Sequence, residues 1–385
     1  MSKNKVLHII TRLIIGGAQE NTMLTAELLD KKKFDVEVLS GSQTGSEGSL
    51  IEEIKKRGIK LKIENYLVRE INPIKDFIAL IKLYKIIKKG NYKVVHTHSS
   101  KAGIAGRFAA WFAGVPVIIH TVHGWGHTPY QHPVIRNFYI LLEKITQKMS
   151  NRLIAVSPKD IDKGLKQGIA TKKKYIVIRS GIETDRFGKC KISKNEMKKK
   201  LNIPENSIVI GTVTRLSPQK APLDFIKACS IIAKKNNNAF FVIVGDGNLR
   251  FDAEQMVKDL KIENRFIFTG LRRDVPELMT AFDIFVLSSL WEGLPRVLPQ
   301  AMATGLPIVA TSIDGSAEAV EDGLNGFLVP PKMPEEIAKK VIYLIDNPAI
   351  ANKMGNNGKK LVDIFSAKKM VDDIEKLYLN ELYKL

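Results

Sequence analysis

The chain has few cysteines and no long apolar segment. Cys190 and Cys229 are too few for a disulfide framework and do not form a C-x-x-C pair. This scarcity indicates a reducing compartment, so we expect a cytoplasmic protein. No apolar run approaches the roughly 18 residues of a membrane-spanning helix. Val6–Ile10 is interrupted by Thr11 and Arg12, and it therefore indicates a buried strand rather than a signal peptide.

Acidic residues are scarce in the first half of the chain. Residues 1–200 carry 38 lysines and arginines against 17 aspartates and glutamates, whereas residues 201–385 carry 22 against 23. An excess confined to one half favours an anionic partner for that half: a membrane surface, a nucleic acid or a phosphorylated acceptor. The alternative is a lysine-rich surface that only maintains solubility.

Short apolar runs alternate with segments of helical periodicity, which predicts parallel β-α-β units. The alternation stops over a lysine-rich stretch and resumes at Ile208–Val213. The expected parts are a domain at 1–187, a linker at 188–206, a second domain at 207–365, and a C-terminal helix at 366–385 that packs toward the first domain. Ligands bind beyond the carboxyl ends of the strands in open α/β sheets, so two such domains facing each other would form a cleft.

The loop after Ile208–Val213 is the first candidate site. Arg215 and Lys220 flank a turn marked by Ser217 and Pro218. The forked guanidinium and the compact ammonium can converge on a diphosphate and stabilise its negative charge as it departs. The alternative is a solvated loop that carries two basic residues.

Trp291–Ala303 is the second candidate site. Its prolines and the free backbone N–H groups of a helix start favour phosphate binding. Glu292 lies just ahead of the expected helix, and Gln300 lies eight residues on, so about two turns would point both side chains the same way. Their oxygens suit sugar hydroxyls. The alternative makes Glu292 a simple helix cap.

Glycines and histidines mark other strand ends. The pair Gly16-Gly17 lets backbone approach a ligand, but it is not the G-x-G-x-x-G fingerprint of a dinucleotide enzyme. Five of the seven histidines lie between His96 and His127. A zinc site is conceivable, but no cysteine lies nearby and the H-x-x-H spacing falls on strand and loop, so we expect no metal.

An aromatic segment follows these histidines. Trp125–Tyr130 and Pro133–Leu142 interleave aromatic residues with His132 and Arg136. This composition suits a membrane interface or a polyprenyl-linked acceptor. The alternative is a helix packed in the domain core.

Together these motifs resemble the retaining glycosyltransferases of family 4, which have the GT-B fold of two Rossmann-like α/β domains facing across a cleft. The resemblance covers nearly the whole chain. It rests mainly on Arg215–Lys220, Gly245–Gly247, Phe268–Gly270, Trp291–Ala303 and Gly305–Ala310. It is closest to enzymes of capsule, lipopolysaccharide and exopolysaccharide synthesis.

The resemblance implies roles for the donor side. Arg215 and Lys220 would hold the donor diphosphate, and Glu292 would contact the donor sugar as the first residue of the family's Glu-x7-Glu motif. Gln300 stands where the second glutamate usually bonds the ribose, and Ala221 stands where the family commonly has glycine. The full donor-binding set is Gly16, Gly17, Arg215, Lys220, Gly270, Glu292, Gly293, Leu294 and Gln300.

It also implies an active-site histidine on the acceptor side, for which His123 is the best match and His120 the rival. The acceptor-side set is His98, Lys101 and His120. The expected catalytic residues are His123, Glu292, Arg215 and Lys220.

The expected activity is transfer of a hexose or N-acetylhexosamine from a nucleoside-diphosphate sugar to a glycan or lipid-linked acceptor. It would proceed with retention, without metal and without a cofactor, in the cytoplasm or at the inner face of the cell membrane. Two alternatives remain: a GT-B sugar-nucleotide 2-epimerase, and a basic nucleic-acid-binding protein. No nucleic-acid recognition motif is present, so we expect no nucleic-acid partner.

Overall fold

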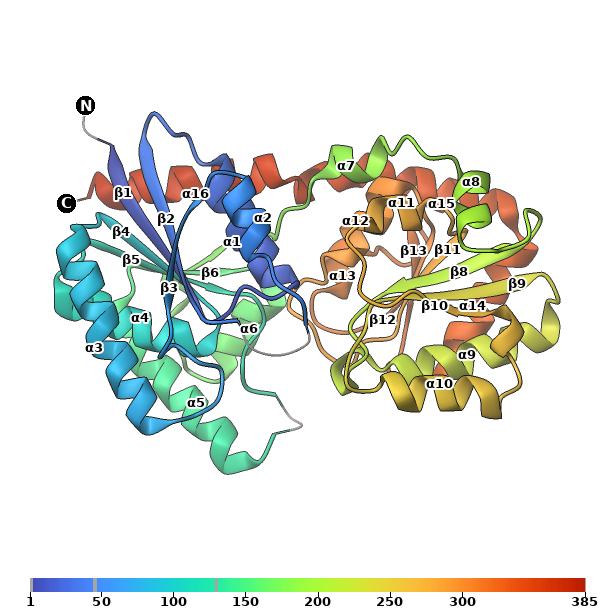
Figure 1. Ribbon diagram of the computed structural model, residues 1–385, viewed down its shortest axis with the longest axis horizontal. Coiled ribbons are helices and arrows are strands. Elements are labelled where there is room, and N and C mark those ends of the chain that lie inside the picture. The colour runs from blue at the N-terminus through green and yellow to red at the C-terminus, as the bar shows by residue number, and fades with distance from the viewer. Residues whose placement is uncertain (1–2, 44–46, 129–130, 385) are drawn as a thin grey trace. The chain divides into compact units, whose positions relative to one another are not determined.

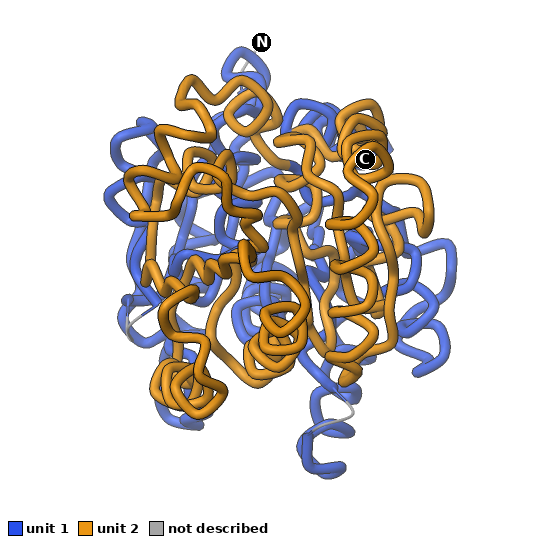
Figure 2. Tube along the Cα trace, turned by 90° about the vertical axis from the view of Figure 1, so that its right-hand side faces the viewer, with its two compact units in different colours: residues 1–181, 367–385 blue, residues 182–366 orange. Residues whose placement is uncertain are grey.

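The computed structural model describes residues 3–43, 47–128 and 131–384 (Figure 1). Contacts between residues divide the chain into two compact units (Figure 2). Unit 1 comprises residues 1–181 and 367–385, and unit 2 comprises residues 182–366. The C-terminal helix α16 (Ala367–Leu382) therefore belongs to unit 1. Residues 188–206 lie within unit 2 and include α8 (Lys194–Lys200), which begins with a capping box.

Unit 1 is built on a parallel sheet of seven strands in the order β3-β2-β1-β4-β5-β6-β7. The strands are β1 (Asn4–Ile10), β2 (Phe34–Gly41), β3 (Lys60–Glu64), β4 (Val94–His98), β5 (Val117–Val122), β6 (Arg152–Ala155) and β7 (Tyr175–Val177). The helices between them are α1 (Gly17–Leu28), α2 (Ile51–Lys56), α3 (Pro73–Gly90), α4 (Ser100–Ala113), α5 (Pro133–Thr146) and α6 (Pro158–Lys166).

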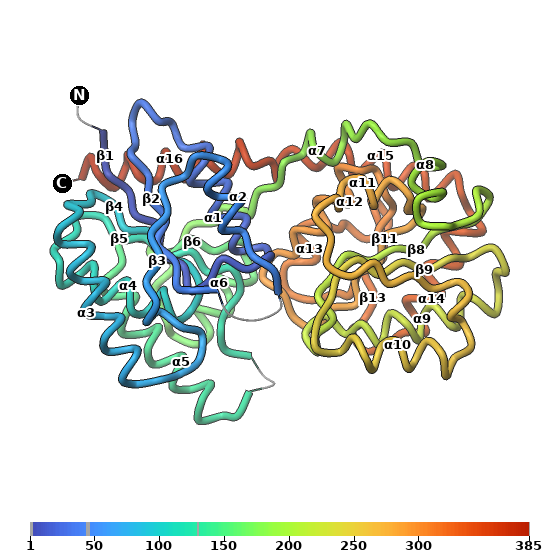
Figure 3. The backbone as a smooth tube through the Cα atoms, viewed as in Figure 1, coloured from blue at the N-terminus to red at the C-terminus, as the bar shows by residue number. Residues whose placement is uncertain are grey.

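Successive residues of a strand point to opposite faces of a sheet, and this sorts the core of unit 1 into two layers. Val6 and Val94 pack with α1 and α16 on one face. Leu7 and Val95 pack with α3 and α4 on the other. The tube in Figure 3 follows α3, α4 and α5 along that second face. The sheet is therefore buried on both sides, as parallel sheets require.

Unit 2 is built on a parallel sheet of six strands in the order β10-β9-β8-β11-β12-β13. The strands are β8 (Ile208–Val213), β9 (Ala239–Val244), β10 (Phe266–Phe268), β11 (Ile284–Leu287), β12 (Ile308–Thr311) and β13 (Gly326–Val329). Besides α8, its helices are α7 (Thr184–Gly188), α9 (Pro222–Lys235), α10 (Arg250–Asp259), α11 (Val275–Met279), α12 (Val297–Thr304), α13 (Ser316–Ala319), α14 (Pro334–Asp346) and α15 (Pro348–Leu361).

The two parallel sheets with their helices confirm the predicted Rossmann-like α/β class. The sequence reading missed the edge strands β3 and β13. β3 has lysines at alternate positions and buries little of its length, so its apolar signal is weak. In the part of the chain that the structure describes, no helix combines the length and apolar character needed to cross a bilayer.

Candidate functional site

The donor-side candidates gather where the strand order of unit 2 reverses. β8 and β11 are neighbours in the sheet, but the chain visits β9 and β10 between them. The loops that leave β8 and β11 therefore lie side by side at the carboxyl ends of their strands. This switch point is where open α/β sheets bind ligands.

One ion pair joins these two loops. The Lys220 Nζ atom contacts Glu292 Oε1, and both side chains are largely buried. Ser289 Oγ donates to the same carboxylate oxygen at 2.8 Å, and the Glu292 backbone N–H donates to Asp314 Oδ2 at 3.3 Å. The motif residues that the sequence identified separately are thus brought into direct contact, 72 residues apart in the chain.

Hydrogen bonds to the backbone hold the Lys220 loop in place. The Ser288 hydroxyl lies 3.0 Å from the carbonyl oxygens of both Lys220 and Ala221. Gln219 accepts from the Leu290 N–H through its carbonyl and donates its side-chain amide to the carbonyl of Trp291. The ammonium of Lys220 therefore projects from a fixed turn, the short helix η3 (Pro218–Lys220).

Ala221 ends that turn in a left-handed conformation, with φ 44° and ψ 54°. The positive φ that glycine supplies at this place in the family is therefore needed here as well. Alanine adopts this left-handed conformation at a cost of about 1 kcal/mol, because its Cβ crowds the backbone when φ is positive.

Glycines allow three loops to pack backbone against backbone beside Arg215. A Cβ on Gly245 would lie 1.9 Å from the carbonyl oxygen of Thr214, and one on Gly247 would lie 2.3 Å from that of Leu216. Gly270 has φ 68° and accepts a hydrogen bond from the Gly245 N–H at 2.9 Å. Arg215 itself is exposed on the loop after β8.

The second donor segment differs from expectation in one respect. α12 begins at Val297, so Glu292, Gly293 and Leu294 lie in a loop ahead of it. Glu292 is therefore not a helix cap, and the argument that two helical turns align it with Gln300 was wrong. Pro295 disfavours the helical conformation at Leu294 before it, which favours a helix that begins after Pro295. Gln300 lies in α12 and is nearly buried.

Unit 1 has a switch point of its own, between β1 and β4. Gly16 and Gly17 form the start of α1 in the loop after β1. Thr11 in the same loop pairs with Ser99 across the switch point, with 2.7 Å between their hydroxyl oxygens. Ser99 has φ 61°, which a residue with a Cβ rarely adopts. Such strain is concentrated at ligand-binding and catalytic positions.

The two rival histidines lie on opposite faces of the unit 1 sheet. His120 is 3% exposed, points toward α4 and bonds the Thr97 hydroxyl through Nδ1 at 2.9 Å. Its ring lies 2.5 Å from where a Cβ on Gly103 would be, so α4 covers it completely. His123 follows β5 and is half-buried. Of these two histidines, only His123 is accessible to a ligand bound at unit 1.

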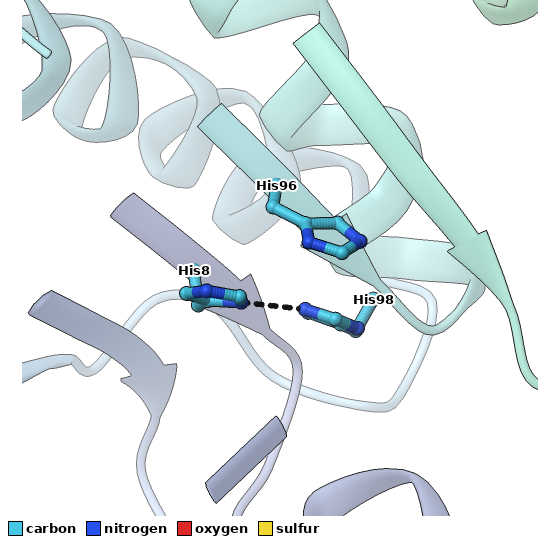
Figure 4. A group of neighbouring side chains, drawn as sticks. All are labelled: His8, His96 and His98. Carbon is cyan, nitrogen blue, oxygen red and sulfur yellow. Dashed lines mark hydrogen bonds between the residues drawn. The ribbon is translucent and has the colours of Figure 1, made fainter. Parts of the chain in front are cut away.

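A chain of hydrogen bonds leads from His123 into the core. His123 Nε2 lies 3.0 Å from His98 Nδ1, and His98 Nε2 lies 2.9 Å from His8 Nδ1. Figure 4 shows how His8, His96 and His98 converge from neighbouring strands. The hydroxyl of Tyr378 lies 3.4 Å from His8 Nε2 and 2.6 Å from His96 Nδ1. We call the five residues His123, His98, His8, Tyr378 and His96 the histidine chain.

Burial keeps His8, His96 and His98 uncharged. It lowers the pKa of His8 to about 3 and lowers the pKa values of His96 and His98 well below their usual range. A neutral imidazole has one N–H donor and one acceptor nitrogen. The bonds must then run in one direction along the chain, so the tautomer of His123 is coupled to the hydrogen bond that Tyr378 makes.

The same cluster has the compactness of a metal site. One nitrogen from each of His8, His96 and His98 lies within 4.8 Å of the others. However, His96 Nε2 also bonds the Thr121 hydroxyl at 2.6 Å, so all six ring nitrogens have hydrogen-bond partners within the protein. A metal would have to displace several of these bonds, and the donor set fits a hydrogen-bonded chain better.

Comparison with known proteins identifies the chain's family. The model described as "Glycosyltransferase Family 4" matches residues 15–186, and the model "Glycosyl transferases group 1" matches residues 193–361. A curated relative from Escherichia coli is 34% identical over 383 residues, covering 98% of this chain and 97% of its own. The chain belongs to family 4 of the glycosyltransferases. That relative is named UDP-Gal:alpha-D-GlcNAc-diphosphoundecaprenol alpha-1,3-galactosyltransferase.

A second relative and a solved structure agree with this family 4 assignment. The capsular polysaccharide glycosyltransferase CapM of Staphylococcus aureus is 24% identical, with 98% of this chain and 97% of that protein covered. Among solved structures, Anabaena HepE in complex with UDP and glucose superposes with a TM-score of 0.85 at 21% identity, covering 98% and 100% of the two chains. This likeness confirms the GT-B fold.

The structure of this glycosyltransferase adds residues that the sequence reading overlooked. His8 and Tyr378 belong to the histidine chain, and both are fully buried. The alternation of side chains along the strand could have identified His8, because its side chain lies on the same face of the sheet as that of His96.

Two of the predicted acceptor-side residues have partners or cover within the protein. Lys101 pairs with Asp76 of α3 at 2.6 Å, and His98 is only 1% exposed, so each acts first on a neighbour within the protein.

Proposed function

We propose that the protein transfers a hexosyl group from a uridine-diphosphate sugar to an acceptor sugar carried on a lipid diphosphate. The transfer retains the anomeric configuration and needs no metal ion. The Lys220–Glu292 pair at the switch point of unit 2 is the observation that carries this proposal. The name of the 34% identical relative suggests the chemical class of both substrates.

The donor diphosphate is assigned to Lys220 and Arg215. Lys220 is held ready by Glu292, and an incoming diphosphate competes for the same ammonium. Glu292 then becomes available to a sugar hydroxyl. Negative charge grows on the diphosphate as its bond to the sugar breaks, so fixed cations lower the barrier to that step. Gly270, Gly293 and Leu294 border the same loops and leave room for the nucleotide.

The acceptor is assigned to unit 1 and His123. His123 orients a hydroxyl, and the histidine chain behind it fixes which ring nitrogen donates. Following the resemblance to retaining enzymes, the acceptor oxygen forms its bond to the anomeric carbon on the face from which the diphosphate departs. The departing phosphate oxygen takes the acceptor proton.

The test is transfer from UDP-galactose to N-acetylglucosamine-diphospholipid, with Lys220→Ala as the variant. We expect the turnover to fall by about 100-fold or more, the usual effect of removing one group that stabilises a developing anion. The matched control is Lys227→Ala, which removes an exposed lysine of α9 in the same unit and should change nothing. A chelator should leave the wild-type rate unchanged.

Three results would contradict the proposal. Equal effects of the two lysine variants would remove Lys220 from the site. A product with inverted anomeric configuration by NMR would exclude retention. Isomerised UDP-sugar formed without acceptor would favour the 2-epimerase alternative.

A further inference from the structure

Helix α5 of unit 1 carries its apolar side chains on the outside. Val134, Phe138, Leu141 and Ile145 are between 39% and 70% exposed. Their spacing of four, three and four residues places them on one face of the helix. The fully buried residues of α5 are instead the polar Glu143 and Thr146. This is the reverse of the pattern that a helix of a water-soluble domain shows.

A buried ion pair attaches the inner side of α5 to the domain. Arg107 of α4 is wholly buried and its Nη2 lies 2.7 Å from Glu143 Oε2. Arg107 Nε also donates to the carbonyl oxygen of Gly103 at 2.8 Å. Removing either charge would leave the other unpaired in the interior, so this pair holds α5 in one orientation. That orientation keeps the apolar stripe outward.

The neighbouring helices continue the pattern. α3 exposes apolar residues at helical spacing, namely Ile74, Phe77, Ile81 and Tyr84. α4 ends with Trp111 and Phe112, which are both more than half exposed. α3, α4 and α5 cover the same face of the sheet (Figure 3). We call these ten exposed residues, including the four of α5, the α3–α5 face. Exposed apolar surface of this extent marks an interaction site.

The charges on these helices identify the partner. Asp76 and Glu143 are the only acidic residues of α3, α4 and α5, and each is paired with a basic residue of the same layer. Lysines dominate the exposed charge, with Lys75, Lys85, Lys88 and Lys89 on α3 and Lys148 just after α5. Apolar side chains flanked by exposed lysines fit an anionic bilayer surface, which offers acyl chains and phosphate groups together.

We infer that the α3–α5 face seats unit 1 on an anionic lipid bilayer. The α5 stripe enters the boundary between head groups and acyl chains, and the lysines contact lipid phosphates. The inference rests on the proposed function only in that a lipid-linked acceptor would be presented at this surface. It assigns the basic excess of the first half of the chain to a membrane rather than to a nucleic acid.

Vesicle co-sedimentation of the full-length protein tests the inference. The probes are vesicles of phosphatidylglycerol with phosphatidylethanolamine, and vesicles of phosphatidylcholine alone. We expect binding to the anionic vesicles, and a loss of at least about ten-fold for the double variant Phe138→Glu, Leu141→Glu. Withdrawing one buried phenylalanine is by itself worth more than the 1.4 kcal/mol that corresponds to this factor.

The matched control is Phe251→Glu in α10 of unit 2, where the phenylalanine is 77% exposed. It introduces one negative charge, as each substitution of the double variant does, at an exposed apolar position outside the face, and its vesicle binding should equal that of the wild type. Unchanged binding by the double variant, or an equal loss in the control, would overturn the inference. So would self-association without vesicles that the double variant abolishes, because the occupant would then be a second copy.

Two further measurements distinguish a failure of this inference from a failure of the proposed function. Stabilisation by UDP in a thermal-shift assay reports on the donor site, and transfer to a water-soluble acceptor analogue reports on catalysis without a membrane. The double variant should retain both the stabilisation and the transfer. Vesicle binding lost with transfer intact is the supporting result. Transfer without any vesicle binding by the wild type defeats the inference and leaves the function standing. Vesicle binding by a wild-type protein that shows no transfer supports the inference and contradicts the proposed function.

Discussion

Ala221 shows how a single residue can keep a backbone conformation that glycine adopts more easily. Its φ of 44° turns the chain between Lys220 and α9. We expect Ala221→Gly to leave the free energy of unfolding unchanged or to raise it by up to about 1 kcal/mol, because relief of strain offsets the extra freedom of the unfolded chain. Urea denaturation followed by tryptophan fluorescence measures this change.

The control for that experiment is Ala228→Gly. Ala228 is fully buried in the interior of α9, so glycine there should lower the free energy of unfolding by about 1 kcal/mol. A comparable loss in Ala221→Gly would mean that the alanine side chain contributes packing worth more than the strain.

Gln300 is a second residue of interest, because the family resemblance implies a glutamate at its position. If its side chain accepts a hydrogen bond from a ribose hydroxyl, Gln300→Glu preserves the acceptor and should keep the transfer rate within about ten-fold. Gln300→Ala removes it, and the loss of one neutral hydrogen bond should weaken donor binding by roughly two-fold to ten-fold. Initial transfer rates measure the first effect, and calorimetric titration with UDP-galactose measures the second. An inactive Gln300→Glu variant would show that the neutral amide is required.

The sequence identified the donor-side candidates but not their arrangement. Arg215, Lys220 and Glu292 are recognisable because each lies in a local motif after a strand. Their loops meet only because β8 and β11 are neighbours in the sheet, and the order of strands is a property of the folded core. The alignment of Glu292 with Gln300 was wrong because Glu292 lies in the loop ahead of α12.

Among the elements, α16 has an effect that its own sequence does not suggest. The sequence predicts a helix that packs toward the first domain, but not which of its residues enter the core. In the structure it packs over the sheet of unit 1 and brings Tyr378 to two histidines of β1 and β4. A contact that spans 282 residues carries no local signal, so sequence periodicity could not identify it.

Removing the Tyr378 hydroxyl tests the histidine chain at this scale. We expect Tyr378→Phe to lower the free energy of unfolding by about 1–3 kcal/mol, because His8 and His96 each lose a partner in the interior. If the chain also sets the tautomer of His123, the pH profile of transfer will shift while the KM for the donor stays constant. Chemical denaturation and initial rates measure the two effects.

Tyr383→Phe provides the matched control, since Tyr383 lies just beyond α16 and is 85% exposed. It should alter neither stability nor the pH profile. A Tyr378→Phe variant that loses stability with an unchanged pH profile would limit the hydroxyl to a structural role.

At the scale of the whole molecule, titratable histidines are divided unequally. All seven lie in unit 1, and burial lowers the pKa values of at least His8, His96, His98 and His120. The folded state resists protonation of these rings, whereas the unfolded chain takes up protons near pH 6.5. Stability is therefore complete above about pH 6.5 and declines as the pH falls below it.

The size of this decline follows from linkage. Each such histidine removes about 1.4 kcal/mol per pH unit, so His8 alone should cost about 2 kcal/mol at pH 5. Hydrogen exchange resolved by peptide should show protection falling in unit 1 between pH 7 and pH 5, while residues 182–366 keep theirs. Equal losses in both units would show that another group controls acid sensitivity.

The positions at which the chain enters and leaves unit 2 have a consequence for how such enzymes evolve. Ile182 donates its N–H to the carbonyl oxygen of Phe365 at 2.8 Å and bridges Ser366. The whole of unit 2 is therefore an insertion whose two ends are adjacent. Genetic exchange could replace it through two junctions at a single point, leaving the strands of unit 1 intact. Under the proposed assignment of the donor to unit 2 and the acceptor to unit 1, such an exchange would change the activated sugar without rebuilding the unit that binds the acceptor.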